Sequence, residues 1–106
     1  MEPIISMVHD ALLAALQKLL IDVKGAEGVS IIEQLRRDRK LHLSTLARML
    51  RDAGAIDEED LKNIEILRDL RNRVVHEDYH PSREQAKWAL KFVETFIRKR
   101  YPDVKL

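Results

Sequence analysis

The stretch LKNIEILRDLRNRVVHEDY, residues 61–79, decides the fold class of this chain. Its apolar residues recur at intervals of three and four, which places them on one side of an α-helix. This apolar side is made by Ile64, Leu67, Leu70, Val74 and Val75. Asp57, followed by Asp60, offers an N-cap before the stretch, and Pro81 stands where a helix cannot continue. We therefore expect a long helix between Asp57 and Pro81 that buries its apolar side.

A second helical segment is expected at residues 4–24, where apolar residues again recur at helical spacing. Gly25 follows it, and glycine commonly ends a helix. The apolar side of this segment is wide because Ile5, Leu13 and Ile21 extend it. A helix of this kind needs more than one neighbour, so we expect it at the centre of a bundle or at a dimer interface.

Residues 31–53 predict one bent helix or two short helices, and two are favoured. Ser30 followed by Glu33 forms a capping-box pattern, so the first helix is expected to begin there. Ser44 offers a start for the second, and Gly54 an end.

The last expected helix follows Pro81. Ser82 and Gln85 form another capping-box pattern ahead of an amphipathic run. The aromatic residues Trp88, Phe92 and Phe96 recur every four residues in this run, so we expect them in the core.

Length and composition support a single all-α domain over residues 1–106, an up-and-down bundle of four to five helices. The chain has 45% hydrophobic and 35% charged residues, with three Gly, three Pro and no Cys. Its net charge of +1 is far from that of a non-specific nucleic-acid binder. The N-terminus carries Glu2 where a signal peptide is basic, and Asp10 interrupts its apolar run. We expect a cytoplasmic protein with no membrane span.

Four residues in the opening stretch form a candidate site. Asn72, His76 and Tyr79 are four and three residues apart, so on a continuous helix they share one side. Arg71 is five residues before His76, which places it about 140° away around the helix. The two side chains meet only if the helix distorts near Asn72, or if two copies pack so that Arg71 and His76 of each line one cleft.

The run from Arg71 and Asn72 through three residues to His76 resembles the signature of the HEPN superfamily (higher eukaryotes and prokaryotes nucleotide-binding domain). In that family an Arg, followed by a polar residue that is often Asn, precedes a His by four to six positions. About a hundred helical residues, the motif on a late helix and one further helix after it also resemble the family. The resemblance covers most of the chain in architecture and residues 67–79 in motif.

This resemblance implies a homodimer with the motif at the subunit interface, and many members are metal-independent ribonucleases. Carried over by position, Arg71 would hold the scissile phosphate and Asn72 would orient the site. His76 would act as acid or base on the 2′-hydroxyl or the leaving oxygen, and cleavage would leave a 2′,3′-cyclic phosphate. One toxin branch, paired with a minimal nucleotidyltransferase antitoxin, has Tyr two positions after the His. This chain has Asp78 there and Tyr79 one position later.

Other charged residues have simpler interpretations. The stretch RRDRK offers Arg36, Arg37, Arg39 and Lys40, which could contact an RNA backbone or form a solvated helix end. His76 and His80 are four residues apart but lack the further ligands of a zinc helix, so we expect no metal and no cofactor.

We therefore expect a metal-independent endoribonuclease of the toxin or defence type that acts on RNA as a homodimer. The alternative is a non-catalytic module that dimerises and binds a nucleotide or a partner nucleotidyltransferase. A third possibility is a helical domain whose motif is coincidental, in which Arg71 pairs with a carboxylate, His76 is half-buried and Tyr79 makes an interface hydrogen bond.

Overall fold

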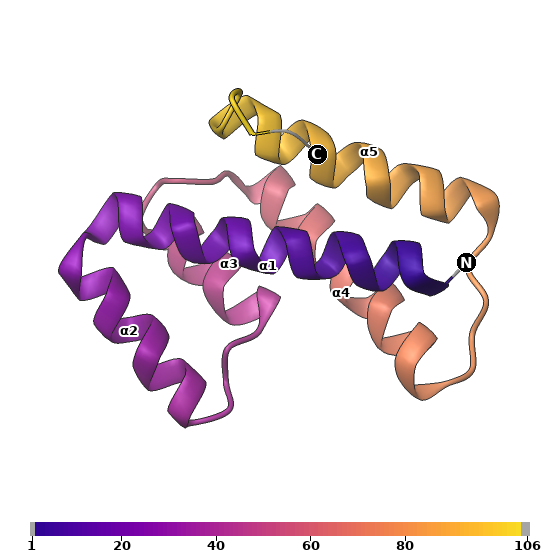
Figure 1. Cartoon of the computed structure of the whole chain (residues 1–106), viewed down its shortest axis with the longest axis horizontal. Coiled ribbons are helices and arrows are strands. Elements are labelled where there is room, and N and C mark those ends of the chain that lie inside the picture. Colours follow the sequence, from indigo (N-terminus) through magenta and orange to yellow (C-terminus); the bar gives the residue numbers. More distant parts are fainter. Residues whose placement is uncertain (1, 105–106) are drawn as a thin grey trace. The chain divides into compact units, whose positions relative to one another are not determined.

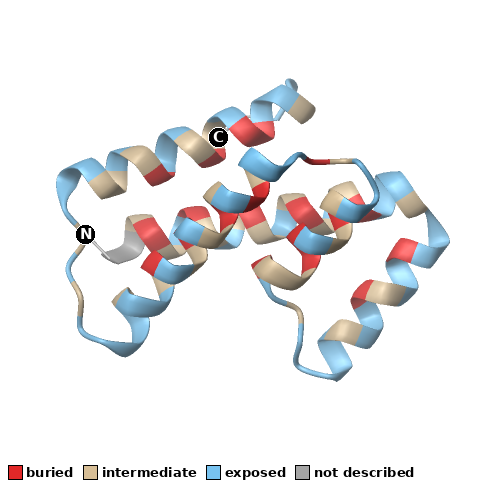
Figure 2. Ribbon diagram, turned by 180° about the vertical axis from the view of Figure 1, so that it is seen from behind, coloured by how far each residue is buried: buried red, intermediate tan, exposed pale blue. Residues whose placement is uncertain are grey.

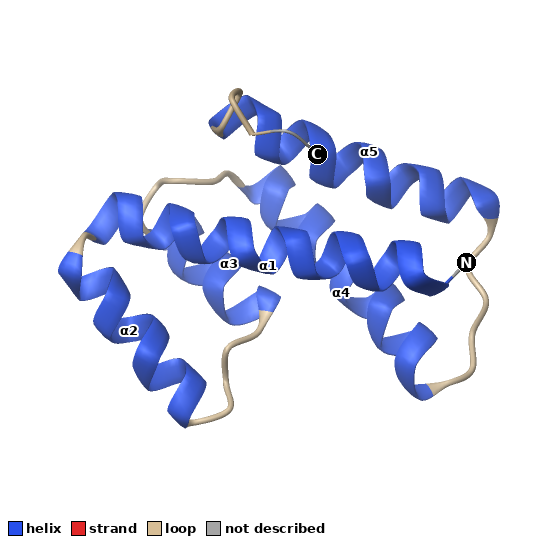
Figure 3. Ribbon diagram, in the orientation of Figure 1, coloured by secondary structure: helices blue, strands red, loops and turns tan. Residues whose placement is uncertain are grey.

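The computed structural model describes residues 2–104, which form five helices and, within that range, no strand (Figures 1 and 3). The all-α class with four to five helices is confirmed. The helices are α1 (Glu2–Lys24), α2 (Ala26–Arg37), α3 (Leu43–Asp52), α4 (Glu58–His76) and α5 (Arg83–Arg100).

The chain divides into two compact units. Of the described residues, the first contains 2–12 and 66–104, and the second contains Leu13–Glu65. Helices α1 and α4 each contribute residues to both units, whereas α5 belongs to the first and α2 and α3 belong to the second. The motif residues 71–79 therefore lie in the first unit, and the basic stretch 36–40 lies in the second.

The apolar residues of α1 supply a large part of the core. Judged by length and composition alone, the segment Ile4–Lys24 is long and apolar enough to cross a membrane. In the structure it is amphipathic, and one residue in every three or four is at most 3% exposed. These buried residues are Ile5, Val8, Leu12, Leu16 and Leu20.

The second helix begins five residues earlier than its capping-box pattern predicts, because its N-cap is Gly25 and not Ser30. Gly25 has a φ of 60°, which ends α1 and allows α2 to begin at once at Ala26. At Gly28, a Cβ atom would lie 2.7 Å from the carbonyl oxygen of Leu20, so only glycine permits this close approach. Ser30 is an exposed residue inside α2, and the predicted start there is wrong.

The prediction of two helices between residues 31 and 53 is confirmed, although the break precedes Ser44. The chain leaves α2 at Asp38, and Arg39 has a φ of 59° that prevents the helix from continuing. The predicted N-cap of α4 is confirmed by a 2.8 Å hydrogen bond that the backbone N–H of Asp60 donates to Asp57 Oδ1.

The apolar side of α4 is buried as far as Leu70. Ile64, Leu67 and Leu70 are at most 6% exposed, and Val74 is half-buried. Val75 is 48% exposed, so its predicted place in the core is wrong. It lies near the end of the helix, which stops at His76 and not at Pro81.

The predicted start of α5 is confirmed in atomic detail. Ser82 Oγ accepts a hydrogen bond from the backbone N–H of Gln85, and Gln85 Oε1 accepts one from the N–H of Ser82. The buried residues of α5 are Ala89, Val93, Phe96 and Ile97. Figure 2 shows that buried and exposed positions alternate along the helix. Phe96 is therefore in the core, but Trp88 and Phe92 are only half-buried, and their predicted burial is wrong.

Candidate functional site on α4 and α5

Arg71 and His76 do not meet within one chain. Helix α4 is continuous from Glu58 to His76, so the distortion near Asn72 that would bring them together is not observed. On a regular helix an offset of five residues leaves the two side chains about 140° apart. A site that contains both side chains therefore requires a second copy of the chain.

Arg71 lies on the buried side of α4, seven residues after Ile64 and four after Leu67. Its side chain is half-buried, and its Nε atom is inaccessible and without a hydrogen-bond partner in the part of the chain that the structure describes. Arg51 and Arg68 have 34% and 35% exposed side chains, and each pairs with a carboxylate. No ion pair joins Arg71 to a described carboxylate, and the unmade hydrogen bond of its buried Nε donor is costly unless a ligand supplies an acceptor.

His76 is the exposed last residue of α4. It makes no hydrogen bond or ion pair with any described residue. Asn72 and Arg73 follow Asp69 by three and four residues, and His76 follows them by four and three. These four residues form one polar side of the helix, which we call the polar face of α4. Within a single chain, the arginine that shares this face with Asn72 and His76 is therefore Arg73 and not Arg71.

Tyr79 is not part of this face, because α4 has ended before it. The expected stripe of Asn72, His76 and Tyr79 is therefore wrong for Tyr79. Its hydroxyl donates a 2.9 Å hydrogen bond to Gln85 Oε1, and its ring lies 5.3 Å from the guanidinium of Arg73. Tyr79 thus attaches the loop between α4 and α5 to the capping box of α5.

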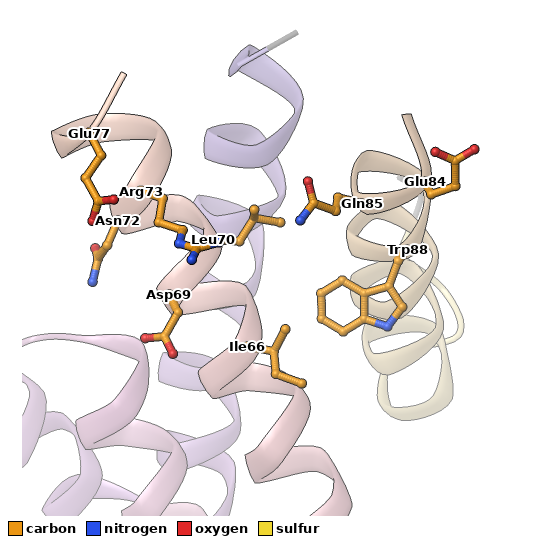
Figure 4. A pocket seen from close by; sticks show the side chains of 9 residues that line it. All are labelled: Ile66, Asp69, Leu70, Asn72, Arg73, Glu77, Glu84, Gln85 and Trp88. Carbon is orange, nitrogen blue, oxygen red and sulfur yellow. The ribbon is translucent and has the colours of Figure 1, made fainter. Parts of the chain in front are cut away.

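A groove of about 700 Å³ lies between α4 and α5, in the first unit (Figure 4). Ile66 and Leu70 of α4 point across it toward Gln85 and Trp88 of α5, and Asn72 and Arg73 also line it. Arg71 and His76 are not among its lining residues. The groove therefore adjoins the polar face but holds only one of the three predicted catalytic residues.

Sequence reasoning missed Trp88 and Gln85 as groove residues. The regular spacing of Trp88, Phe92 and Phe96 indicated a core stripe, but the first two turns of α5 extend beyond the buried part of the helix. The Trp88 ring instead stacks on Phe92, with centroids 5.6 Å apart and planes 8° from parallel. The three-residue spacing of Gln85 and Trp88 is the one signal in the sequence that places them on a common side.

The basic stretch of the second unit faces solvent. Arg36, Arg37, Arg39 and Lys40 are all exposed, and Arg36 Nη2 lies 3.5 Å from Gln17 Oε1. No described carboxylate forms an ion pair with the other three. These cations are free to contact an anionic ligand in solution.

Metal-ligand geometry is absent from the described residues, which contain no cluster of three or more His, Cys, Asp or Glu side chains suited to an ion. His80 Nε2 lies 3.9 Å from Asp78 Oδ1, and His9 Nδ1 lies 3.0 Å from Asp10 Oδ1. Each of these histidines therefore lies near a carboxylate that is one or two residues away in the sequence.

The family described as "Domain of unknown function (DUF4145)" matches residues 11–105. The chain belongs to the DUF4145 family. No curated protein and no solved structure matches it. The matched part of this DUF4145 chain includes residues of both units, the polar face of α4 and every residue of the groove.

Proposed function

We propose that this DUF4145 chain is a cytoplasmic, metal-independent endoribonuclease of the HEPN toxin or defence type, active as a homodimer. The observation that carries the proposal is the half-buried side chain of Arg71, whose buried Nε atom has no hydrogen-bond partner in the described part of the chain. A phosphate diester carries a negative charge and acceptor oxygens, and it can therefore act as the partner that this guanidinium lacks.

In the proposed reaction, His76 removes the proton from a ribose 2′-hydroxyl. The 2′-oxygen then forms a bond to the adjacent phosphorus, and the bond from phosphorus to the 5′-oxygen breaks. The leaving oxygen takes a proton from water, and the proton held by His76 returns to solvent, so the products are a 2′,3′-cyclic phosphate and a 5′-hydroxyl. Arg71 binds the extra negative charge that develops on the phosphate, and Asn72 orients it.

The position of each residue supports this division of roles. His76 is exposed at the end of α4, where RNA can reach it, and it makes no competing contact with a described residue. Arg71 is half-buried on the apolar side of α4, and partial burial limits the conformational freedom that the side chain loses on binding. Because the two do not meet in one chain, the proposal requires that Arg71 of one copy approach His76 of the other.

The same separation favours a second candidate function, a non-catalytic module. Without a dimer that unites Arg71 and His76, the chain would bind a nucleotide or a partner nucleotidyltransferase and cleave nothing. In that case Tyr79, which is already hydrogen-bonded to Gln85, would serve only to fix the loop before α5.

The test is cleavage of a pool of single-stranded and structured RNA in the presence of EDTA. The parent chain is compared with His76→Ala and with His42→Ala, a matched control at an exposed N-cap position whose side chain makes no capping hydrogen bond. Cyclic-phosphate ends should form with the parent and the control, and His76→Ala should lose about 100-fold or more of the rate. Absence of cleavage by the parent, or equal cleavage by His76→Ala, would overturn the ribonuclease proposal.

A further inference from the structure

We infer that the groove between α4 and α5 binds one unpaired nucleotide of the RNA, with its base against Trp88 and its phosphate at Arg73. This inference rests on the proposed function, because it names how the substrate of that reaction is held. The groove volume of about 700 Å³ lies within the range of small-ligand sites, so it accommodates a single nucleotide.

The wall formed by α5 is suited to a flat aromatic group. Trp88 is half-buried, and its stacking on Phe92 fixes the plane of the ring. Ile66, which is 45% exposed, points toward it from α4 (Figure 4). An unpaired base that enters between them covers apolar surface on both sides, as in proteins that bind single-stranded RNA by stacking.

The wall formed by α4 supplies the positive charge. The Arg73 guanidinium lies over the Tyr79 ring and forms no ion pair or hydrogen bond with any described residue. Gln85 holds Tyr79, so the capping box of α5 indirectly fixes the Arg73 side chain. A phosphate bound to Arg73 lies on the polar face of α4, one helical turn from His76.

The carboxylates around the groove decide which class of ligand fits. Asp69 is paired with Arg68 at 2.6 Å, and Glu84 points away from the groove (Figure 4). Glu77 is the remaining exposed carboxylate of the lining. The negative charge of Glu77 repels a nucleotide phosphate but would attract an arginine side chain of a peptide partner. Removal of this charge therefore distinguishes the two ligands.

Trp88 is the only tryptophan of the chain, so tryptophan fluorescence reports on this groove alone. The probe is a 2′-O-methyl oligoadenylate, which cannot be cleaved because its 2′-hydroxyl is blocked. It should quench the emission at concentrations where an abasic oligomer of equal length does not. An abasic oligomer that quenches equally would overturn the inference, because the base would then have no part in binding.

Variants separate the contributions of base and phosphate. Trp88→Ala, followed by anisotropy of a labelled oligomer, should weaken binding about tenfold. Ile66→Ser changes the opposite wall, leaves the fluorophore in place and should reduce the quenching. Arg73→Ala should weaken binding more than Lys91→Ala, a control that removes the same charge from an exposed position of α5 outside the groove.

Glu77→Gln should strengthen oligomer binding. Weaker binding in this variant, or quenching by an arginine-containing peptide and not by the oligomer, would assign the groove to a peptide and refute the inference. Failure of the groove differs from failure of the proposed function. An active ribonuclease whose fluorescence is unaffected by the oligomer refutes the groove alone, whereas quenching without any cleavage in EDTA refutes only the ribonuclease.

Discussion

Replacement of Arg71 by Met should change stability and activity in opposite directions. Arg71 lies on the buried side of α4, and its Nε has no hydrogen-bond partner among residues 2–104. A buried donor without a partner costs about 1–3 kcal/mol. Met retains an unbranched stem that can pack against the core but carries neither the donor nor the charge. Because the side chain is only half-buried, we expect the free energy of unfolding to rise by the lower value, about 1 kcal/mol.

For a domain of this size, 1 kcal/mol corresponds to an increase in melting temperature of about 4–8 °C. The melting temperature is measured by circular dichroism at matched protein concentrations, since dissociation of a dimer is linked to unfolding. RNA cleavage should be lost in the same variant. Stability gained together with activity lost is the pattern expected of a residue that is kept for function.

The matched control is Arg68→Met, the same substitution on the same helix. Its side chain is 35% exposed and pairs with Asp69, so its removal should cost between zero and about 1 kcal/mol. If Arg71→Met lowers the free energy of unfolding by more than the control does, Arg71 is a stabilising structural residue. The reasoning that assigns it to phosphate binding would then be refuted.

Two further predictions concern the helix ends. Ser82→Ala removes the capping box of α5 and should cost about 1 kcal/mol in urea unfolding, whereas Ser30→Ala, inside α2, should be close to neutral; equal effects would contradict the observed start of α2. Gly28→Ala places a Cβ atom 2.7 Å from the backbone carbonyl oxygen of Leu20, so we expect a loss of about 1–3 kcal/mol by the same measurement. A neutral Gly28→Ala would show that α2 does not lie so close to α1.

The parts of the fold that depend on local chemistry could be predicted from the sequence. The helical spacing of α1 and α4 and the caps at Asp57 and Ser82 involve residues within a turn of one another, and the structure contains them as expected. The predicted start at Ser30 was wrong because Gly25 adopts a positive φ, which ends α1 and lets α2 begin directly after it.

The candidate site was less predictable because it depends on where α4 ends and on which helices become neighbours. Tyr79 was placed on a helical stripe, but the helix stops at His76 and the residue instead contacts the capping box of α5. Trp88 belongs to an aromatic stripe on α5, but the first turns of this helix extend past the core. Periodicity alone does not show how far along a helix the core reaches. The spacing of Arg71 and His76 did predict that they would not meet in one chain.

The central claim, a composite site shared by two copies, is tested most directly by complementation. Arg71→Met and His76→Ala chains, each expected to be inactive alone, are co-expressed with different tags, and the mixed dimers are purified. A mixed dimer keeps one intact Arg71 and one intact His76 on different chains, so the account predicts that cleavage with cyclic-phosphate ends returns to about half of the parent rate. Mixed dimers as inactive as either variant alone would contradict it.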